Sequence, residues 1–257
     1  MSRIANAFAN GKAFIGYVTG GDPSIAMSEE YILALIDAGA NLIEIGIPFS
    51  DPIAEGPVIQ ESSLRALHAD TTTENIFSLV SSLRLKTSVP LVLLTYLNPV
   101  LHYGYEPFFS RCAQTGVDGI IIPDLPFDEK DEVNDVAASY GVDLISMIAP
   151  TSAQRIAQIA SGATGFIYLV SSMGVTGVRS QINTDIDAIV KVIRSVTTTP
   201  IAVGFGIHTP DQAREMALKA DGVIVGSGIV KRIAANPQGA CRELTDYVKS
   251  LKDAIHV

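Results

Sequence analysis

The stretch LIEIGIPFSDP occupies residues 42–52, and its apolar first part, LIEIGI at residues 42–47, contains one carboxylate, Glu44. Its aliphatic and β-branched side chains predict a buried strand, and Glu44 lies inside that strand. A second acid, Glu55, lies in the loop that follows. A buried ionised carboxylate is costly unless a neighbour compensates it, so Glu44 at a strand end is a candidate for proton transfer. A structural acid paired with an arginine or with backbone amides is the alternative.

Seven more short apolar runs alternate with longer amphipathic stretches along the chain. Such runs are typical of parallel strands covered on both faces. Eight strand–helix units in 257 residues give about 32 residues each, close to the pitch of a (β/α)8 TIM barrel. We therefore expect one barrel domain over residues 1–257; the eight units and the lack of a GxGxxG motif disfavour a doubly wound open sheet. The expected strands are Phe14–Val18, Leu42–Gly46, Leu91–Thr95, Gly119–Ile122, Val142–Met147, Gly165–Leu169, Ile201–Val203 and Gly222–Val225.

Amphipathic patterns predict helices between these strands. Beyond the eight units, Met1–Asn10 predicts an added helix that closes the lower end of the barrel, and Pro57–His68 predicts an extra helix inside the second connection. A threonine before a proline, Thr209-Pro210, marks the start of another helix. Further helical patterns cover Glu29–Ala38, Thr73–Arg84, Glu106–Thr115, Glu129–Tyr140 and Asp185–Ser195.

The composition and charge exclude several classes of protein. The formal net charge is −9, and no basic run is long enough to follow a phosphate backbone, which argues against nucleic acid and anionic membranes. No apolar run approaches the ~18 residues of a membrane span, and the N-terminus lacks the apolar core of a signal peptide. Cys112 and Cys241 are far apart and belong to no CxxC pair. We therefore expect a cytoplasmic protein with two buried thiols.

In a barrel of this kind the chemistry lies at the C-terminal ends of the strands. Alternation along residues 42–46 places Leu42, Glu44 and Gly46 on one face and the two isoleucines on the other. If the isoleucines face the helices, Glu44 points into the mouth of the barrel. Further polar side chains expected around the same opening are Tyr17, Thr19, Asp22, Tyr96, Asn98 and Asp124.

Each of the last three expected strands is followed by a glycine cluster: GVTG at residues 174–177, GFG at 204–206 and GSG at 226–228. Glycines allow backbone N–H groups to approach an anion closely. The third cluster also opens a short helix, whose N-terminus favours a phosphate. A phosphate site near the last two strands is recurrent in this architecture, so the pattern predicts a phosphorylated ligand. Ordinary turn glycines are the alternative.

Some catalytic residue types are absent from the strand ends, and their absence excludes several kinds of reaction. No lysine lies there, which argues against an imine-forming aldolase. The four histidines are scattered without carboxylate partners at metal-ligand spacing, which argues against a metal-dependent aldolase. His208 follows Gly206 and Ile207 and could reach the site, but we expect it in a solvated loop. The remaining chemistry is acid–base work by carboxylates, without a cofactor or metal, on a phosphorylated and largely apolar substrate.

Several motifs together resemble the α subunit of tryptophan synthase, from about Asn6 to Lys231. The matching motifs are EIGIPFSDP (residues 44–52), GP (56–57), IQ (59–60), TGGDP (19–23), YLNP (96–99), PDLP (123–126) and the three glycine clusters. The resemblance implies a lyase of tryptophan biosynthesis. Such an enzyme cleaves indole-3-glycerol phosphate to indole and glyceraldehyde 3-phosphate in a retro-aldol reaction.

The resemblance also implies roles for individual residues. Glu44 matches the family's acid–base residue, and Glu55 matches the carboxylate that accepts the indole N–H and stabilises the positive charge developing there. Burial in an apolar strand is expected to raise the pKa of Glu44, whereas Glu55, in a polar loop, is expected to stay ionised. The matching substrate-binding positions are Tyr17, Tyr96, Asp124 and Tyr168, and the phosphate-binding positions are Gly177, Phe205, Gly206, Gly226 and Ser227.

The chain departs from the family pattern at three positions. Glu55 stands where Asp is usual, Gly16 where Pro is common and Gly20 where Ala is usual. The extra methylene of Glu55 moves its carboxylate by about 1 Å or more unless the loop adjusts, and misplacement on that scale is costly in rate. We therefore expect either a shifted loop or low activity without a partner.

The partner implied by the resemblance is a β subunit that carries pyridoxal phosphate, in an α2β2 heterotetramer, with indole passed between the subunits. This chain has no lysine placed to hold that cofactor and is expected to bind none. The loops Pro48–Gly56 and Met173–Thr184 are the expected couplers between the subunits. A stand-alone lyase that releases free indole and a degenerate barrel that only regulates a β partner are the alternatives.

Overall fold

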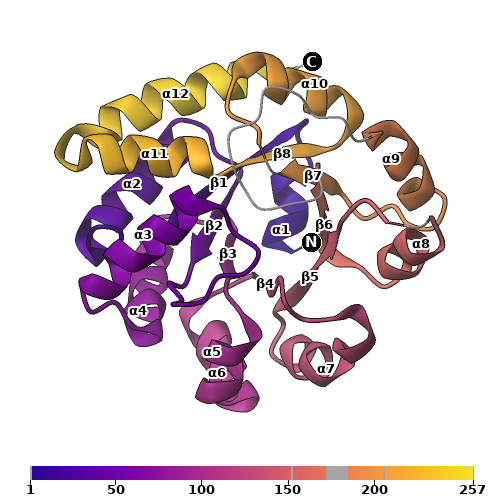
Figure 1. The fold of residues 1–257 in the computed structure, drawn as a ribbon, viewed down its shortest axis with the longest axis horizontal. Helices are drawn as coiled ribbons and strands as arrows, with labels where there is room; N and C mark the ends of the chain where they lie inside the picture. Colours follow the sequence, from indigo (N-terminus) through magenta and orange to yellow (C-terminus); the bar gives the residue numbers. More distant parts are fainter. Residues whose placement is uncertain (1, 152, 172–184, 205, 257) are drawn as a thin grey trace.

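The computed structural model describes residues 2–151, 153–171, 185–204 and 206–256. Eight parallel strands form a closed barrel in which each strand pairs with the next in the chain and β8 pairs with β1 (Figure 1). All eight expected strands are confirmed, with ends that differ by at most one residue. The strands are β1 (Ala13–Thr19), β2 (Leu42–Gly46), β3 (Leu91–Leu94), β4 (Gly119–Ile121), β5 (Asp143–Ile148), β6 (Thr164–Val170), β7 (Ile201–Gly204) and β8 (Gly222–Val225).

The connecting helices surround the barrel, and α1 lies across one of its ends (Figure 1). The extra helix expected inside the second connection is confirmed as α3. The N-terminal helix is shorter than the expected Met1–Asn10: Ser2 is its N-cap, and its last residue is Ala7. The helices are α1 (Arg3–Ala7), α2 (Ile25–Asp37), α3 (Pro57–His68), α4 (Thr73–Arg84), α5 (Leu97–Tyr103), α6 (Tyr105–Thr115), α7 (Asp131–Ser139), α8 (Ala153–Ser161), α9 (Ile186–Arg194), α10 (Pro210–Lys219), α11 (Ser227–Ala235) and α12 (Ala240–Ala254), with 3-10 turns η1 (Phe127–Glu129) and η2 (Pro237–Gly239).

The two faces of the strands pack into separate clusters, as the alternation along β2 predicts. Leu42 belongs to the cluster inside the barrel, together with Ile4 and Ala7 of α1. Ile43 and Ile45 belong to the larger cluster between the strands and the surrounding helices. Glu44 therefore shares the inward face with Leu42, at the end of the barrel opposite α1.

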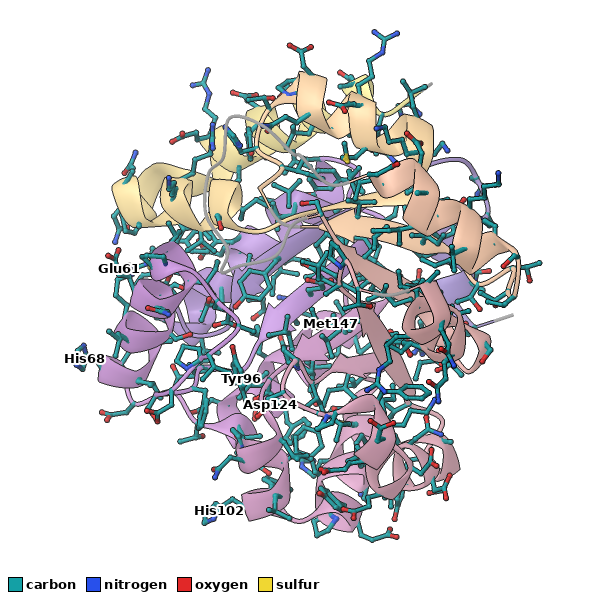
Figure 2. The ribbon with its side chains drawn as sticks, turned by 45° about the vertical axis from the view of Figure 1, so that its right-hand side comes forward. Glu61, His68, Tyr96, His102, Asp124 and Met147 are labelled. Carbon is teal, nitrogen blue, oxygen red and sulfur yellow. The ribbon has the colours of Figure 1, made fainter. Side chains whose placement is uncertain are left out.

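The exposed histidines do not converge on the barrel mouth. His68 at the end of α3 and His102 in α5 point outward on different helices (Figure 2). Within the described ranges, no group of three or more His, Cys, Asp or Glu side chains is arranged to hold a metal ion. The same residues also include no helix long and apolar enough to cross a membrane.

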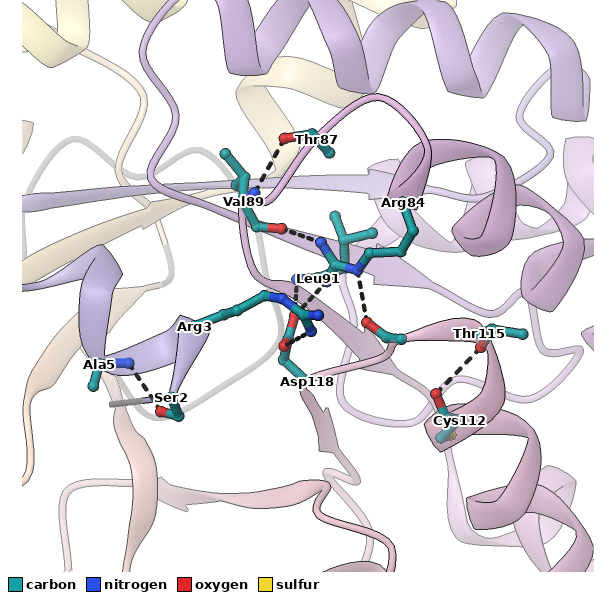
Figure 3. Close-up of polar contacts among 11 residues, drawn as sticks. Ser2, Arg3, Ala5, Arg84, Thr87, Val89, Leu91, Cys112, Thr115 and Asp118 are labelled. Atoms are coloured by element: carbon teal, nitrogen blue, oxygen red, sulfur yellow. Dashed lines mark hydrogen bonds and ion pairs between the residues drawn. The ribbon is translucent and has the colours of Figure 1, made fainter.

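Asp118, in the loop before β4, ties α1 to the lower end of the barrel (Figure 3). Its carboxylate accepts hydrogen bonds from Arg3, from Arg84 and from the backbone N–H of Leu91, the last at 2.8 Å. The side chains of Asp118 and Arg84 are only 9% and 12% exposed, whereas that of Arg3 is 48% exposed. The buried ion pair between Asp118 and Arg84 is therefore expected to contribute more to stability than the exposed pair between Asp118 and Arg3.

Asp118→Ala is expected to lower the free energy of unfolding by about 3 kcal/mol, because it leaves the Arg84 guanidinium largely buried without its counter-charge. Arg3→Ala is the matched control. It removes the exposed partner of the same carboxylate and is expected to cost less than about 1 kcal/mol. Denaturant titration of both variants measures the difference; equal losses would show that burial of the Arg84 pair is not what stabilises this end.

Candidate active site

A cavity opens at the C-terminal ends of the strands. Seven of the residues expected in the site line it: Tyr17, Glu44, Glu55, Tyr168, Gly206, Gly226 and Ser227. Two others expected there, Gly177 and Phe205, lie outside the described residues, as does the expected coupling loop Met173–Thr184. The residues that line this opening come from all eight strands or from the loops that follow them.

Glu44 is buried in this cavity with little to compensate a charge. Its side chain is 1% exposed, and among the described residues its Oε1 has no hydrogen-bond partner. Burial raises the pKa of its carboxyl to about 8. The structural alternative needs an arginine or amides around the carboxylate, and the described residues supply no ion pair to it. The carboxyl is therefore protonated at neutral pH and free to donate its proton into the cavity.

Glu55 is also buried, which corrects the expectation that it stays ionised in a polar loop. The side chain lines the cavity, is 8% exposed, and has its pKa raised by burial to about 7, with a hydrogen bond from Tyr96 acting in the opposite direction. The loop after β2 folds inward over the barrel mouth, and this placement removes the carboxyl from solvent. Glu55 consequently exchanges its proton close to neutral pH.

Tyr96 lies behind the loop that carries Glu55 instead of lining the cavity. Its hydroxyl accepts a hydrogen bond from the backbone N–H of Ala54 at 3.0 Å and also bonds the Glu55 carboxyl. Its ring stacks on Phe49, with ring centroids 5.4 Å apart. Tyr96 thus fixes the loop Pro48–Gly56 at two points and holds the second carboxyl in place.

Two acids expected at the mouth have structural partners. Asp124 lies beside Tyr96 (Figure 2), and its Oδ1 accepts the backbone N–H of Leu97 at 2.8 Å, at the start of α5. Asp22 forms a two-point pair with Arg65 of α3, at 2.8 and 2.7 Å. Neither carboxylate lines the cavity. Each carboxylate connects a strand-end loop to a helix that follows the neighbouring strand.

Tyr17 and Tyr168 line the barrel mouth together with Glu44. Tyr17 is in register with Glu44 on the neighbouring strand, and the charge of Glu44 contributes to the raised pKa of Tyr168. A Cβ at Gly46 would collide with the Tyr17 hydroxyl, and one at Gly204 would collide with the Tyr168 ring. These two glycines therefore leave the space in which the phenol rings lie.

The N-terminus of α11 supplies a place for an anion on the wall of the same cavity. Gly226 and Ser227, at the start of this nine-residue helix, both line the cavity. Among the described residues, no side chain caps the first turn of α11 by a hydrogen bond. Free backbone N–H groups at a helix N-terminus favour a phosphate, as the sequence predicts.

Several lining residues escape the motif-based prediction. Leu94, Met147 and Ile224 line the cavity from the ends of β3, β5 and β8, and they continue the inward face of their strands. Strand alternation carried to the last residue could have found them. His208 also lines the cavity, which corrects its expected place in a solvated loop, and its Nδ1 lies 2.8 Å from the carbonyl oxygen of Gly206.

A closed (β/α)8 barrel with two protonatable carboxyls and a helix N-terminus in one cavity defines a barrel enzyme that works by acid–base chemistry. The model of the tryptophan synthase alpha chain family matches residues 4–256. This chain belongs to the tryptophan synthase alpha chain family.

Individual relatives match over nearly the full length. The tryptophan synthase alpha chain of Lacticaseibacillus casei is 47% identical over 255 residues, which cover 99% of this chain and 96% of that one. Tryptophan synthase subunit alpha from Legionella pneumophila has a TM-score of 0.89 at 32% identity and covers 99% of this chain and 98% of its own. A chain of the tryptophan synthase complex from Pyrococcus furiosus has a TM-score of 0.85 at 34% identity, covering 95% of this chain and 99% of its own.

Proposed function

We propose that Glu44 is the acid–base residue with which this chain cleaves indole-3-glycerol phosphate to indole and glyceraldehyde 3-phosphate. The lyase activity is that of the family to which the chain belongs. The observation that carries the assignment is the Glu44 carboxyl, which is buried in the cavity, lacks a partner for Oε1 among the described residues and is protonated at neutral pH.

The reaction needs one proton given and one proton taken. The Glu44 carboxyl donates its proton to C3 of the indole ring, and the ring nitrogen takes up the positive charge. The bond between C3 and the first glycerol carbon then breaks, its electron pair neutralises the ring, and the Glu44 carboxylate removes the proton of the hydroxyl that becomes the aldehyde. A single carboxyl with a pKa of about 8 is suited to both transfers.

Glu55 is proposed to stabilise the positive charge on the ring nitrogen. In its ionised form it accepts the indole N–H, and an anion fixed in a dry cavity interacts strongly with a charge that develops there. Tyr96 supports this role, since its hydrogen bond lowers the pKa of the carboxyl against the effect of burial. The longer side chain of Glu, in place of the usual Asp, reaches the cavity from a loop held by Tyr96.

The phosphate is proposed to lie at Gly206, Gly226 and Ser227, with Gly177 and Phe205 as further contacts expected from the sequence. Support comes from the exposed N–H groups at the start of α11 and from the position of these residues on the cavity wall. Tyr17 and Tyr168 are proposed to flank the indole and glycerol parts of the substrate, and Tyr96 and Asp124 to support the site from behind it.

The pH dependence of cleavage follows from the two carboxyls. The free enzyme is active when Glu44 is protonated and Glu55 is ionised. Glu44 loses its proton above its pKa of about 8, and Glu55 loses its charge below its pKa of about 7. A plot of kcat/KM against pH is therefore expected to be bell-shaped with its maximum between these values. A profile that stays level from about pH 6 to 9 would contradict the assignment of the two protonation states.

The chain is further proposed to dock on a β subunit, with pyridoxal phosphate held by that partner alone. The similarity to a chain of the Pyrococcus furiosus tryptophan synthase complex supports this proposal, and the loop Pro48–Gly56, which carries Glu55 and borders the cavity, is the proposed coupler. An α2β2 assembly is the expected stoichiometry.

One assay tests both proposals. Indole formation from indole-3-glycerol phosphate is measured first with the chain alone and then with a β subunit added. Activation by the partner is expected. Fast indole release that the partner leaves unchanged would contradict the docking proposal and favour a stand-alone lyase, and absence of indole in both cases would favour a regulatory barrel.

A further inference from the structure

We propose that the Tyr17 hydroxyl is a fixed hydrogen-bond acceptor for a hydroxyl group of the glycerol chain of the substrate. This inference rests on the proposed function, since it assigns a further binding contact in the same cavity. Three observations carry it: a chain of buried hydroxyls, the direction of its hydrogen bonds, and the place of the Tyr17 ring in the cavity.

The hydroxyl chain runs from the cavity into α3. The Tyr17 hydroxyl lies 3.2 Å from Oγ1 of Thr19, and Oγ1 of Thr19 lies 2.6 Å from Oγ of Ser62. The Ser62 hydroxyl donates to the carbonyl oxygen of Ile59 at 2.7 Å. The side chains of all three hydroxyl-bearing residues are buried, Ser62 completely. The chain therefore ends at a group that can only accept.

A terminal carbonyl fixes the direction of every hydrogen bond in the chain. Each hydroxyl has one proton. Because Ser62 gives its proton to Ile59, it must accept from Thr19, and Thr19 must then accept from Tyr17. The Tyr17 proton points away from the cavity, so the phenol oxygen presents a lone pair to a ligand and no proton. Burial and the nearby carboxyls raise the Tyr17 pKa well above its usual value, which keeps that proton in place.

The Tyr17 ring extends between the two ends of the proposed substrate. At one end, the ring and Cβ lie about 3.4 Å from the position of a Cβ at Gly226, beside the proposed phosphate site. At the other end, the hydroxyl lies over Gly46, two residues beyond Glu44 on the same face of β2. A ligand that joins the phosphate site to Glu44 therefore passes along Tyr17 with its glycerol chain.

The glycerol chain brings two secondary hydroxyl groups, each a hydrogen-bond donor. The indole N–H is already assigned to Glu55, so the phenol oxygen of Tyr17 is left to accept a hydrogen bond from a glycerol hydroxyl. A phenylalanine at this position would pack equally well and would offer no acceptor. The contact thus discriminates a substrate with hydroxyls from one without them.

The test compares two ligands in a background that cannot turn over. Indole-3-glycerol phosphate and indole-3-propanol phosphate share the ring and the phosphate, but the second lacks both secondary hydroxyls. Their affinities are measured by calorimetry for Glu44→Gln and for that variant combined with Tyr17→Phe, with Ser62→Ala or with Ser63→Ala. Ser63 is a buried serine of the same helix outside the hydroxyl chain and serves as the matched control.

Tyr17→Phe is expected to weaken binding of the glycerol ligand about 2- to 10-fold, which is the effect of losing one neutral hydrogen bond. The affinity for the propanol ligand is expected to stay unchanged. Ser62→Ala lies outside the cavity and removes the group that fixes the direction of the hydrogen bonds in the hydroxyl chain. It is expected to cause a smaller loss of affinity, for the glycerol ligand alone. Ser63→Ala is expected to cause no selective loss of affinity. Equal losses for both ligands, or none for either, would overturn the inference. Failure of the Glu44→Gln chain to bind either ligand would instead count against the proposed function.

Discussion

Glu44→Gln is expected to reduce the turnover number for indole formation by on the order of 10³-fold or more while the barrel remains folded. The amide has nearly the same shape as the carboxyl but can neither supply the proton to C3 nor accept the one from the glycerol hydroxyl. Both transfers are proposed for this one side chain, so its loss removes the chemistry and leaves the binding residues in place. Quenched-flow or steady-state measurement of indole release checks the turnover number.

The stability of the same variant provides the control. In the folded protein the pKa of Glu44 is about 8, above its ordinary value of 4.5, so the folded state binds this proton more tightly than the unfolded chain does. The contribution of Glu44 to stability is therefore present at low pH and is lost as pH rises through the window between these two values. Glu44→Gln is expected to remove that component and to be at least as stable as the parent at pH 8. Near-normal turnover in a folded variant would remove Glu44 from the reaction.

Glu55→Gln is expected to reduce turnover by on the order of 10²-fold, since a neutral amide stabilises positive charge on the ring nitrogen far less than a carboxylate does. The acid limb of the pH profile should vanish in the same variant, because Glu55 is the group assigned to it. Retention of that limb would assign it to another group.

Glu55→Asp is the conservative counterpart and is expected to preserve or raise activity, because it restores the residue usual in the family. A large loss would show that the loop Pro48–Gly56 and its contacts with Tyr96 are built around the longer side chain. Steady-state kinetics of both Glu55 variants, with and without a β subunit, separates these outcomes.

The barrel and its central acid could be predicted because the signals are local. Eight apolar runs mark the strands, and the alternation of Leu42, Ile43, Glu44 and Ile45 decides which side chain faces inward. The pKa of Glu44 depends mainly on burial, which the surrounding apolar residues already indicate.

The burial of Glu55 could not be predicted from the residues next to it in the sequence. Its polar loop indicates exposure, but Tyr96, from the end of another strand, holds the loop over the cavity. Likewise Asp124 looks like a site residue at a strand end, and only the fold shows its contact with the N–H of Leu97. Contacts between loops from different strands depend on barrel closure, which motifs do not encode.

A structure of the chain with indole-3-propanol phosphate bound tests whether Glu44 is placed to protonate the indole ring. We expect the indole C3 in van der Waals contact with the Glu44 carboxyl, the ring N–H on Glu55 and the phosphate on the N–H groups at the start of α11. An indole ring bound away from Glu44, with the phosphate elsewhere than Gly226 and Ser227, would contradict it.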